Sequence, residues 1–133
     1  MNILLTTKLP IEGFTSISEH NIIMPEVAKF TPTELIEHLA DADILLSTFD
    51  YKITAEMIAA APNLKLITNF GVGFNNVDIA AARDRGIPVT NTPGPVIEPT
   101  AEHTFTLMLA ICHRTAELDR RMRQPNSDIE FGV

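Results

Sequence analysis

The chain has 133 residues, of which 45% are hydrophobic and 20% are charged. This composition excludes an intrinsically disordered chain, and the length predicts one domain with an ordinary hydrophobic core. The formal net charge of −7 argues against a nucleic-acid backbone as a partner.

Five short apolar runs alternate with helical segments along the first 90 residues. Continuous apolar runs are typical of strands that are covered on both faces of a parallel sheet. Two of the helical segments between these runs begin with residues that typically cap helices. Thr31-Pro32-Thr33-Glu34 forms a capping box, and Thr54 can cap a later helix. The predicted strands are 2–7, 21–24, 44–47, 64–69 and 87–90, and the predicted helices are 32–40, 55–61 and 77–85.

This alternation predicts an α/β fold, with a flavodoxin-like, doubly wound parallel sheet of five strands in the order 2-1-3-4-5. Ligands of such sheets bind beyond the carboxyl ends of the strands. We therefore expect the segments that follow strands to rim one crevice. These segments are Thr7, 47–51, 69–73 and 91–94.

A long helix is predicted over 100–123, after the prolines and glycine of 92–99 break regular structure. Its first half is apolar almost all round, which predicts burial, and its second half is polar. A helix of about 24 residues spans roughly 36 Å, which is long for so small a domain. The predicted parts are a domain at 1–99, a connecting helix at 100–123 and a frayed tail at 124–133.

The most informative motif is 64–78, where a predicted strand runs into Gly71-Val72-Gly73 and a helix is predicted to start at Val77. Main-chain N–H groups at such a junction can point at an anion, and glycine lets a ligand approach closely. We expect a cradle for a carboxylate or phosphate here, with Asn91 and Thr92 hydrogen-bonded to the surrounding loops. A tight turn without a ligand is the alternative interpretation.

A dinucleotide site at this loop is disfavoured. The dinucleotide fingerprint needs glycine or alanine at its sixth position, where this chain has Asn76. It also needs an acidic residue about 20 positions further on, where this chain has Val89, Thr90, Asn91 and Thr92.

Three segments, in order, resemble the N-terminal substrate-binding (catalytic) part of the D-isomer-specific 2-hydroxyacid dehydrogenases. Residues 71–78 (GVGFNNVD) resemble the family's Gly-x-Gly-x-Asp-Asn-Ile/Val-Asp segment, with Asn75 where the family often has Asp. Residues 86–94 (GIPVTNTPG) resemble its Gly-Ile-x-Val-x-Asn-Thr-Pro-Gly segment. The run from Ala101-Glu102-His103 to Arg114 resembles its Ala-Glu helix.

The resemblance implies that the N–H groups of Gly71, Val72 and Gly73 hold a substrate carboxylate. It also implies that the loop at Phe49-Asp50-Tyr51 flanks the substrate's side chain, so that Asp50 and Tyr51 are further candidate substrate-binding residues. The implied reaction is hydride transfer between a nicotinamide and a small 2-oxo or 2-hydroxy acid.

The resemblance further implies an NAD- or NADP-binding Rossmann domain inserted after the long helix, and a homodimer. The family's catalytic Arg, Glu and His and its Gly-x-Gly-x-x-Gly loop would lie beyond this chain. We therefore assign no catalytic and no cofactor-binding residue. We expect the chain alone to be inactive and to bind no cofactor tightly.

Other site types are disfavoured by spacing and context. His103 and His113 lack the i, i+4 spacing of a metal pair, so no metal site is predicted. The basic cluster at 120–123 lies close to acidic residues and is expected to be a solvated helix face. Cys112 is the only cysteine, which excludes an intrachain disulfide, and its apolar context predicts a buried thiol.

No apolar run approaches the roughly 20 residues of a membrane helix, so we expect a cytoplasmic protein with no membrane partner. One alternative function is a non-catalytic binding or dimerisation module that uses the apolar part of the long helix, 105–112. A receiver-type signalling domain is a weaker alternative, because Thr6-Thr7-Lys8 stands where an acidic pair would be needed.

Overall fold

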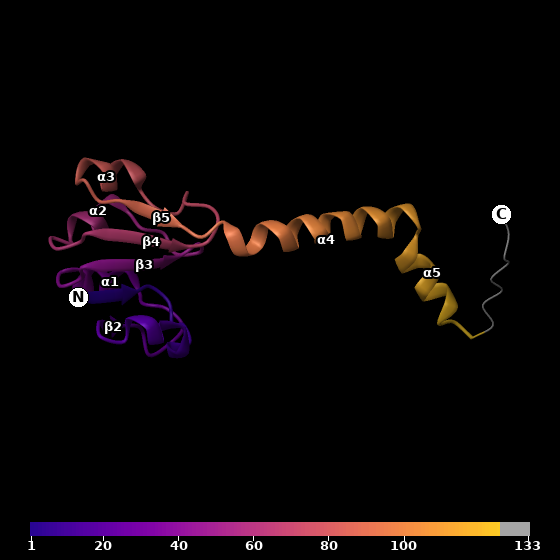
Figure 1. Cartoon of the computed structure of the whole chain (residues 1–133), viewed down its shortest axis with the longest axis horizontal. Coiled ribbons are helices and arrows are strands. Elements are labelled where there is room, and N and C mark those ends of the chain that lie inside the picture. The colour runs from indigo at the N-terminus through magenta and orange to yellow at the C-terminus, as the bar shows by residue number, and fades with distance from the viewer. Residues whose placement is uncertain (126–133) are drawn as a thin grey trace. The chain divides into compact units, whose positions relative to one another are not determined.

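A computed structural model describes residues 1–125 of the chain (Figure 1). The chain divides into two compact units, Met1–Pro93 and Gly94–Val133, of which the second is described as far as Pro125. Within the described residues, no helix is both long enough and apolar enough to cross a bilayer.

The first unit is built on a parallel sheet of five strands (Figure 1). The strands lie in the order β2-β1-β3-β4-β5, which confirms the predicted flavodoxin-like topology. Leu4 pairs with Leu45, Leu45 with Ile67 and Ile67 with Val89, so one apolar row crosses the sheet. The strands are β1 (Asn2–Leu5), β2 (Asn21–Ile23), β3 (Ile44–Thr48), β4 (Leu66–Phe70) and β5 (Val89–Asn91).

Three helices, α1 (Pro32–Leu39), α2 (Ala55–Ala59) and α3 (Ile79–Asp84), cover one face of this sheet. Alternate residues of a strand point to opposite faces, so Leu45 and Ile67 face these helices with Leu4. The buried helical partners of these three residues are Leu35, Leu39, Met57, Ile58 and Ala82.

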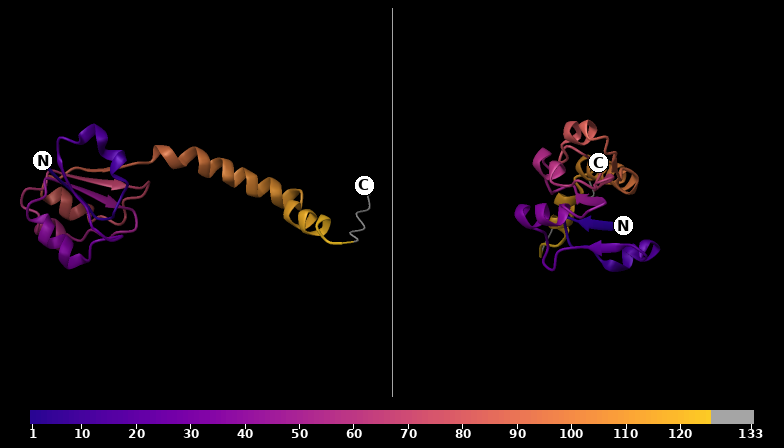
Figure 2. Two further views of the ribbon diagram at one scale, coloured as in Figure 1. Left: turned by 90° about the horizontal axis from the view of Figure 1, so that it is seen from below. Right: turned by 90° about the vertical axis from the view of Figure 1, so that its left-hand side faces the viewer.

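The opposite face carries a 3-10 helix, η1 (Ile11–Ile17), which the sequence reading missed. The connection from β1 to β2 runs across the sheet in the opposite direction to the connection from β3 to β4. Because both crossovers are right-handed, η1 lies on the opposite face from α2. Figure 2 shows η1 on the side of the sheet away from α1 and α2. Side chains of η1 and β2, among them Phe14 and Ile22, line a shared hollow.

Local capping chemistry sets the helix ends in this unit. The capping box at Thr31 is present, and the Thr54 hydroxyl accepts from the Met57 N–H at 3.3 Å. The third helix begins at Ile79 rather than at the predicted Val77, because Asp78 is its N-cap and accepts from the Ala81 N–H at 3.0 Å.

The second unit contains α4 (Gly94–Cys112) and α5 (Thr115–Met122), so the predicted single helix over 100–123 is wrong at its start and in being uninterrupted. The helix starts earlier because Pro95 lies in the first turn, where its missing N–H has no helical partner to lose. It ends at Cys112, and Arg114, just before α5, adopts a left-handed conformation with a φ of 51°. The two compact units divide after Pro93, at the start of α4.

The predicted burial of the apolar part of α4 is wrong for this chain. Its large apolar side chains are exposed, and so is the Cys112 thiol, which was predicted to be buried. A helix that is apolar all round is buried only if other elements pack against it, and the sequence of the helix does not identify those elements. The exposed side chains are Phe105, Leu107, Met108, Leu109 and Ile111.

The basic residues of α5 form a solvated face, as predicted. The Arg123 guanidinium lies 2.9 Å from the Asp119 carboxylate, and both side chains are exposed. Of the predicted frayed tail, residues 126–133 lie outside the described part of the chain.

Candidate functional site

Two loops at the carboxyl edge of the sheet are tied to each other by main-chain hydrogen bonds. One follows β3 and the other follows β4. The Phe49 N–H donates to the Phe70 carbonyl at 3.3 Å, and the Ile53 N–H donates to the Asn76 carbonyl at 2.8 Å. The Ile53 carbonyl accepts from the Asp78 N–H at 3.0 Å. The two loops therefore form one unit.

A pair of asparagine side chains holds this unit together. Asn69 is fully buried, and its Nδ2 donates to the Gly73 carbonyl at 2.6 Å. The Nδ2 of Asn76 lies 3.0 Å from Asn69 Oδ1, 3.1 Å from the Thr48 carbonyl and 3.0 Å from the Tyr51 carbonyl. Its amide protons are thus shared among acceptors from both loops.

The sequence reading used Asn76 only to reject a dinucleotide fingerprint and missed this role. The available signal was an asparagine in a loop directly after a buried strand, since such side chains often bond to nearby main chain.

All three carbonyls of Gly71-Val72-Gly73 are held by protein donors. The Thr92 N–H donates to the Gly71 carbonyl at 2.9 Å, and Asn91 Nδ2 donates to the Val72 carbonyl at 2.7 Å. With the bond from Asn69 to Gly73, every carbonyl of the segment is committed. The predicted hydrogen bonds of Asn91 and Thr92 to the loops around the cradle are confirmed.

The N–H groups of the same segment differ from one another. The Gly71 N–H donates to the Thr92 hydroxyl at 2.9 Å. Among residues 1–125, no protein atom accepts a hydrogen bond from the N–H of Val72 or Gly73. The segment therefore offers two adjacent main-chain donors, rather than the three that the sequence predicted.

The expected helix N-terminus does not contribute to this segment. The third helix begins at Ile79, and the Asp78 side chain caps its first turn. Any attraction for an anion therefore comes from the loop amides themselves, as in other main-chain anion sites.

The glycine at position 71 is required by packing. A Cβ at this position would lie 2.7 Å from the Cβ of Phe49, which is closer than real Cβ atoms approach one another. The loop after β3 and the loop after β4 can therefore meet at this distance only if residue 71 is glycine.

The other two candidate substrate-binding residues have partners of their own. The Asp50 carboxylate is paired with Lys29. Its pKa is lowered most by the hydrogen bond from Lys29 and less by the hydrogen bond from Thr48. Tyr51 is only 8% exposed, and its hydroxyl donates to the Phe30 carbonyl at 3.1 Å. Burial raises the pKa of the Tyr51 phenol, and its side chain belongs to the core rather than to the edge.

Apolar side chains are exposed around the two donors. They come from the loop after β3, from the end of β4 and from the cradle segment itself. They are Phe49, Phe70, Val72 and Phe74. The end of β1 also reaches this edge, because the hydroxyls of Thr7 and Thr48 lie 2.8 Å apart.

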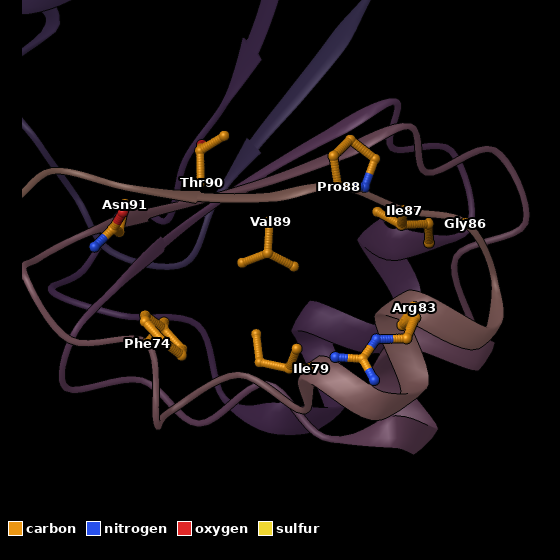
Figure 3. Close-up of a pocket in the computed structure, with 9 residues that line it drawn as sticks. All are labelled: Phe74, Ile79, Arg83, Gly86, Ile87, Pro88, Val89, Thr90 and Asn91. Carbon is orange, nitrogen blue, oxygen red and sulfur yellow. The ribbon is translucent and has the colours of Figure 1, made fainter.

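A hollow of about 510 Å³ lies between α3 and β5 (Figure 3). Phe74, Ile79 and Val89 line it with apolar groups, and Arg83 lies at its edge. Neither Val72 nor Gly73 lines this hollow. It therefore adjoins the two main-chain donors without containing them.

Within 1–125, no group of three or more His, Cys, Asp or Glu side chains is arranged to hold a metal ion.

Residues 3–125 match the family model described as D-isomer specific 2-hydroxyacid dehydrogenase, catalytic domain. The chain belongs to this family. The family consists of oxidoreductases, and the assignment agrees with the resemblance that the three sequence segments carry.

Curated relatives include two proteins named glyoxylate reductase. The one from Korarchaeum cryptofilum is 36% identical over 124 residues, and the match covers 92% of this chain and 37% of the relative. The one from Thermofilum pendens is 38% identical over 122 residues, with 90% and 36% covered. This chain thus spans little more than a third of the length of these relatives.

Solved structures show the same fold. The TT0316 protein from Thermus thermophilus superposes with a TM-score of 0.79 at 31% identity, covering all of this chain and 45% of that one. An NAD-dependent formate dehydrogenase from Staphylococcus aureus, solved with NAD, superposes with a TM-score of 0.72 at 29% identity. That match covers 93% of this chain and 42% of the dehydrogenase.

Replacing Asn76 with alanine is expected to lower the free energy of unfolding by about 2 kcal/mol or more, because among residues 1–125 it leaves the Tyr51 carbonyl and the buried Asn69 Oδ1 without a donor. Urea denaturation followed by circular dichroism measures the change. Asn75→Ala, at the exposed neighbouring position, is the matched control and should stay within about 0.5 kcal/mol of the parent. Equal stability of the two variants would contradict the role of Asn76.

Gly71→Ala is expected to destabilise the fold by about 1–3 kcal/mol, because the added methyl meets the Cβ of Phe49. The matched control is Gly13→Ala, where an added Cβ meets no atom within 4 Å. Thermal unfolding of both variants tests the difference, and amide spectra should show displaced Val72 and Gly73 signals only in Gly71→Ala. A Gly71→Ala variant as stable as Gly13→Ala would rule out the steric requirement.

Lys29→Met is expected to raise the pKa of the Asp50 carboxyl toward its ordinary value of about 3.9. A depressed pKa in the folded state means that Asp50 stabilises the fold above its unfolded pKa, and that this contribution disappears as the pH falls through the folded pKa. Carboxyl NMR titration measures the pKa. The Asp43 carboxylate, which is paired with Lys65, is the internal control and should not shift. The same Asp50 midpoint in both proteins would refute the assigned cause.

Proposed function

We propose that this chain is the substrate-binding part of an NAD(P)-dependent D-2-hydroxyacid dehydrogenase. In this proposal the N–H groups of Val72 and Gly73 bind the carboxylate of a small 2-oxo or 2-hydroxy acid. The observation that carries the proposal is the pair of adjacent main-chain donors without protein acceptors, on a segment whose carbonyls are all held. Charge-assisted hydrogen bonds from two such donors suit a carboxylate.

The remaining candidate residues take supporting roles in this proposal. Gly71 lets the two loops meet and gives its N–H to Thr92, which orients the donors that follow. Asp50, paired with Lys29, lies in the loop that flanks the substrate. Tyr51 anchors that loop in the core through its bond to Phe30.

The described residues do not fit a dinucleotide. Asn76 occupies the position where the fingerprint needs a small residue, and its side chain is committed to Asn69 and the loop carbonyls. The third helix is capped by Asp78, so it presents no open N-terminus to a pyrophosphate. We therefore place the nicotinamide cofactor on a Rossmann domain elsewhere in the enzyme.

Either NAD or NADP is compatible with related proteins. The Staphylococcus aureus formate dehydrogenase was solved with NAD. An acyclic imino acid reductase, Bsp5, with a TM-score of 0.79 at 26% identity, was solved with NADPH and D-Arg. The proposed reaction of the whole enzyme is hydride transfer between the nicotinamide and C2 of the bound acid.

Uncovered apolar surface supports a larger assembly. Ile44, Leu46 and Leu66 lie on the sheet face away from α2 and α3 and are only half-buried, although parallel strands are normally covered on both faces. The apolar side chains of α4 are exposed as well. We propose that a Rossmann domain and a second subunit cover such surfaces, in a cytoplasmic homodimer.

A second candidate is a non-catalytic dimerisation module. The exposed side chains of α4, among them Phe105, Leu109 and Ile111, favour it. Such a module would form a stable dimer from this chain alone and would not respond to 2-oxo acids.

The enzyme proposal is tested by turnover. The pure chain, mixed with NADH and a 2-oxo acid, is expected to leave NADH absorbance unchanged, because the cofactor domain is proposed to lie elsewhere. Addition of a separately produced cofactor-binding half of a family member is expected to start NADH oxidation, with that half alone as the control. NADH oxidation by the chain alone would contradict the proposal that the cofactor domain lies elsewhere in the enzyme. A dimer that gives no turnover with any added half would favour the module.

A further inference from the structure

We infer that Asn91 is a positioning residue for the anion site, because its side chain holds the peptide unit between Val72 and Gly73 in the orientation that presents the Gly73 N–H to a carboxylate. The inference rests on the proposed function, since it takes the N–H groups of Val72 and Gly73 as the carboxylate donors. It adds what keeps the second of these donors in place.

The register of the sheet brings Asn91 to this segment. Asn91 at the end of β5 is paired with Asn69 of β4, and residues paired across parallel strands project to the same face of the sheet. The two asparagine side chains reach successive carbonyls of one loop. Asn69 Nδ2 donates to the Gly73 carbonyl at 2.6 Å, and Asn91 Nδ2 donates to the Val72 carbonyl at 2.7 Å.

The bond from Asn91 acts on a donor as well as on a carbonyl. The Val72 carbonyl and the Gly73 N–H belong to the same planar peptide unit, so a bond that fixes the carbonyl also fixes the direction of the N–H. A hydrogen bond accepted by a carbonyl also polarises its peptide unit and strengthens the N–H at the other end. Asn91 therefore both orients and strengthens the Gly73 donor.

This peptide unit depends on a single exposed side chain. The preceding carbonyl, of Gly71, accepts from a main-chain N–H at 2.9 Å, and the following one, of Gly73, accepts from a fully buried asparagine. Asn91, in contrast, is exposed. Among residues 1–125, Asn91 Nδ2 is the only protein donor to the Val72 carbonyl, and the Gly73 N–H has no protein acceptor.

Without Asn91 this peptide unit can turn over. Rotation of a peptide unit by about half a turn distinguishes type II from type I β-turns, and it needs a positive φ at the residue that follows the unit. That residue is Gly73, which does not have a positive φ in this structure but can adopt one without steric cost. The rotation would replace the Gly73 N–H by the Val72 carbonyl oxygen, which repels a carboxylate.

The first measurement needs no ligand. In NMR spectra, Asn91→Ala is expected to shift the signals of the Val72 carbonyl carbon and the Gly73 amide nitrogen, because both atoms belong to the unit that Asn91 holds. The melting temperature should stay within about 2 °C of the parent, since the side chain is exposed.

Asn75→Ala is the matched control. Asn75 is exposed in the same loop, and its Oδ1 would lie 3.0 Å from a Cβ added at Gly73. Within residues 1–125, however, its side chain donates to none of the carbonyls at 71–73. Asn75→Ala should therefore leave the Val72 carbonyl carbon signal in place.

The second measurement is an amide NMR titration with pyruvate. In the parent chain, the Val72 and Gly73 amide signals are expected to shift as pyruvate is added. In Asn91→Ala the dissociation constant is expected to rise about tenfold, as for a unit that presents its N–H about a tenth of the time. Asn91→Gln keeps a side-chain amide and should recover part of the affinity, and Asn75→Ala should bind pyruvate like the parent.

The outcomes separate the two claims. Unchanged pyruvate affinity in Asn91→Ala, or a Val72 carbonyl carbon signal that does not move, would overturn the role of Asn91 and leave the proposed function standing. An equal loss of affinity in Asn75→Ala would overturn it as well, because Asn75 holds no carbonyl of this segment. No shift of either amide of the parent with pyruvate would overturn the proposed function, and the inference with it.

Discussion

The candidate site depends on the half-buried amide side chain of Asn76. Its Nδ2 group reaches Asn69 and two carbonyls of the neighbouring loop, so one side chain fixes both loops at the carboxyl edge of the sheet. In a buried setting an unpaired amide or carbonyl is costly, so such a network has one favoured arrangement. Consistent with this, no buried side-chain nitrogen or oxygen in residues 1–125 lacks a partner.

This constraint has an electrostatic consequence. The chain carries a net charge of −7, so its long-range field repels an anionic acid. Binding such an acid therefore requires donors that act at short range. With its carbonyls held, the segment at 71–73 keeps the Val72 and Gly73 donors in place before any ligand arrives. Donors oriented in advance cost no rearrangement at the moment of binding, which is how main-chain anion sites work.

Sequence reasoning succeeded where the physics is local and failed where it depends on distant neighbours. The strand order and the caps at Thr31 and Thr54 follow from apolar runs, crossover handedness and side-chain acceptors close in sequence. The burial of Cys112 was predicted wrongly, because burial depends on what packs against a helix. The hydrogen bond from the Gly71 N–H to the Thr92 hydroxyl joins residues 21 positions apart in the sequence. No pattern of neighbouring residues predicts such a contact.

The sequence by itself determined the α/β topology and the family, because apolar periodicity, glycine positions and short motifs are properties of neighbouring residues. It also predicted that a ligand binds at the carboxyl edge of the sheet. Only the tertiary structure decided that two main-chain donors remain rather than three, that Tyr51 belongs to the core, and that Phe49 lies beside Gly71. These outcomes rest on hydrogen bonds and close contacts between separate loops, which exist only after the chain has folded.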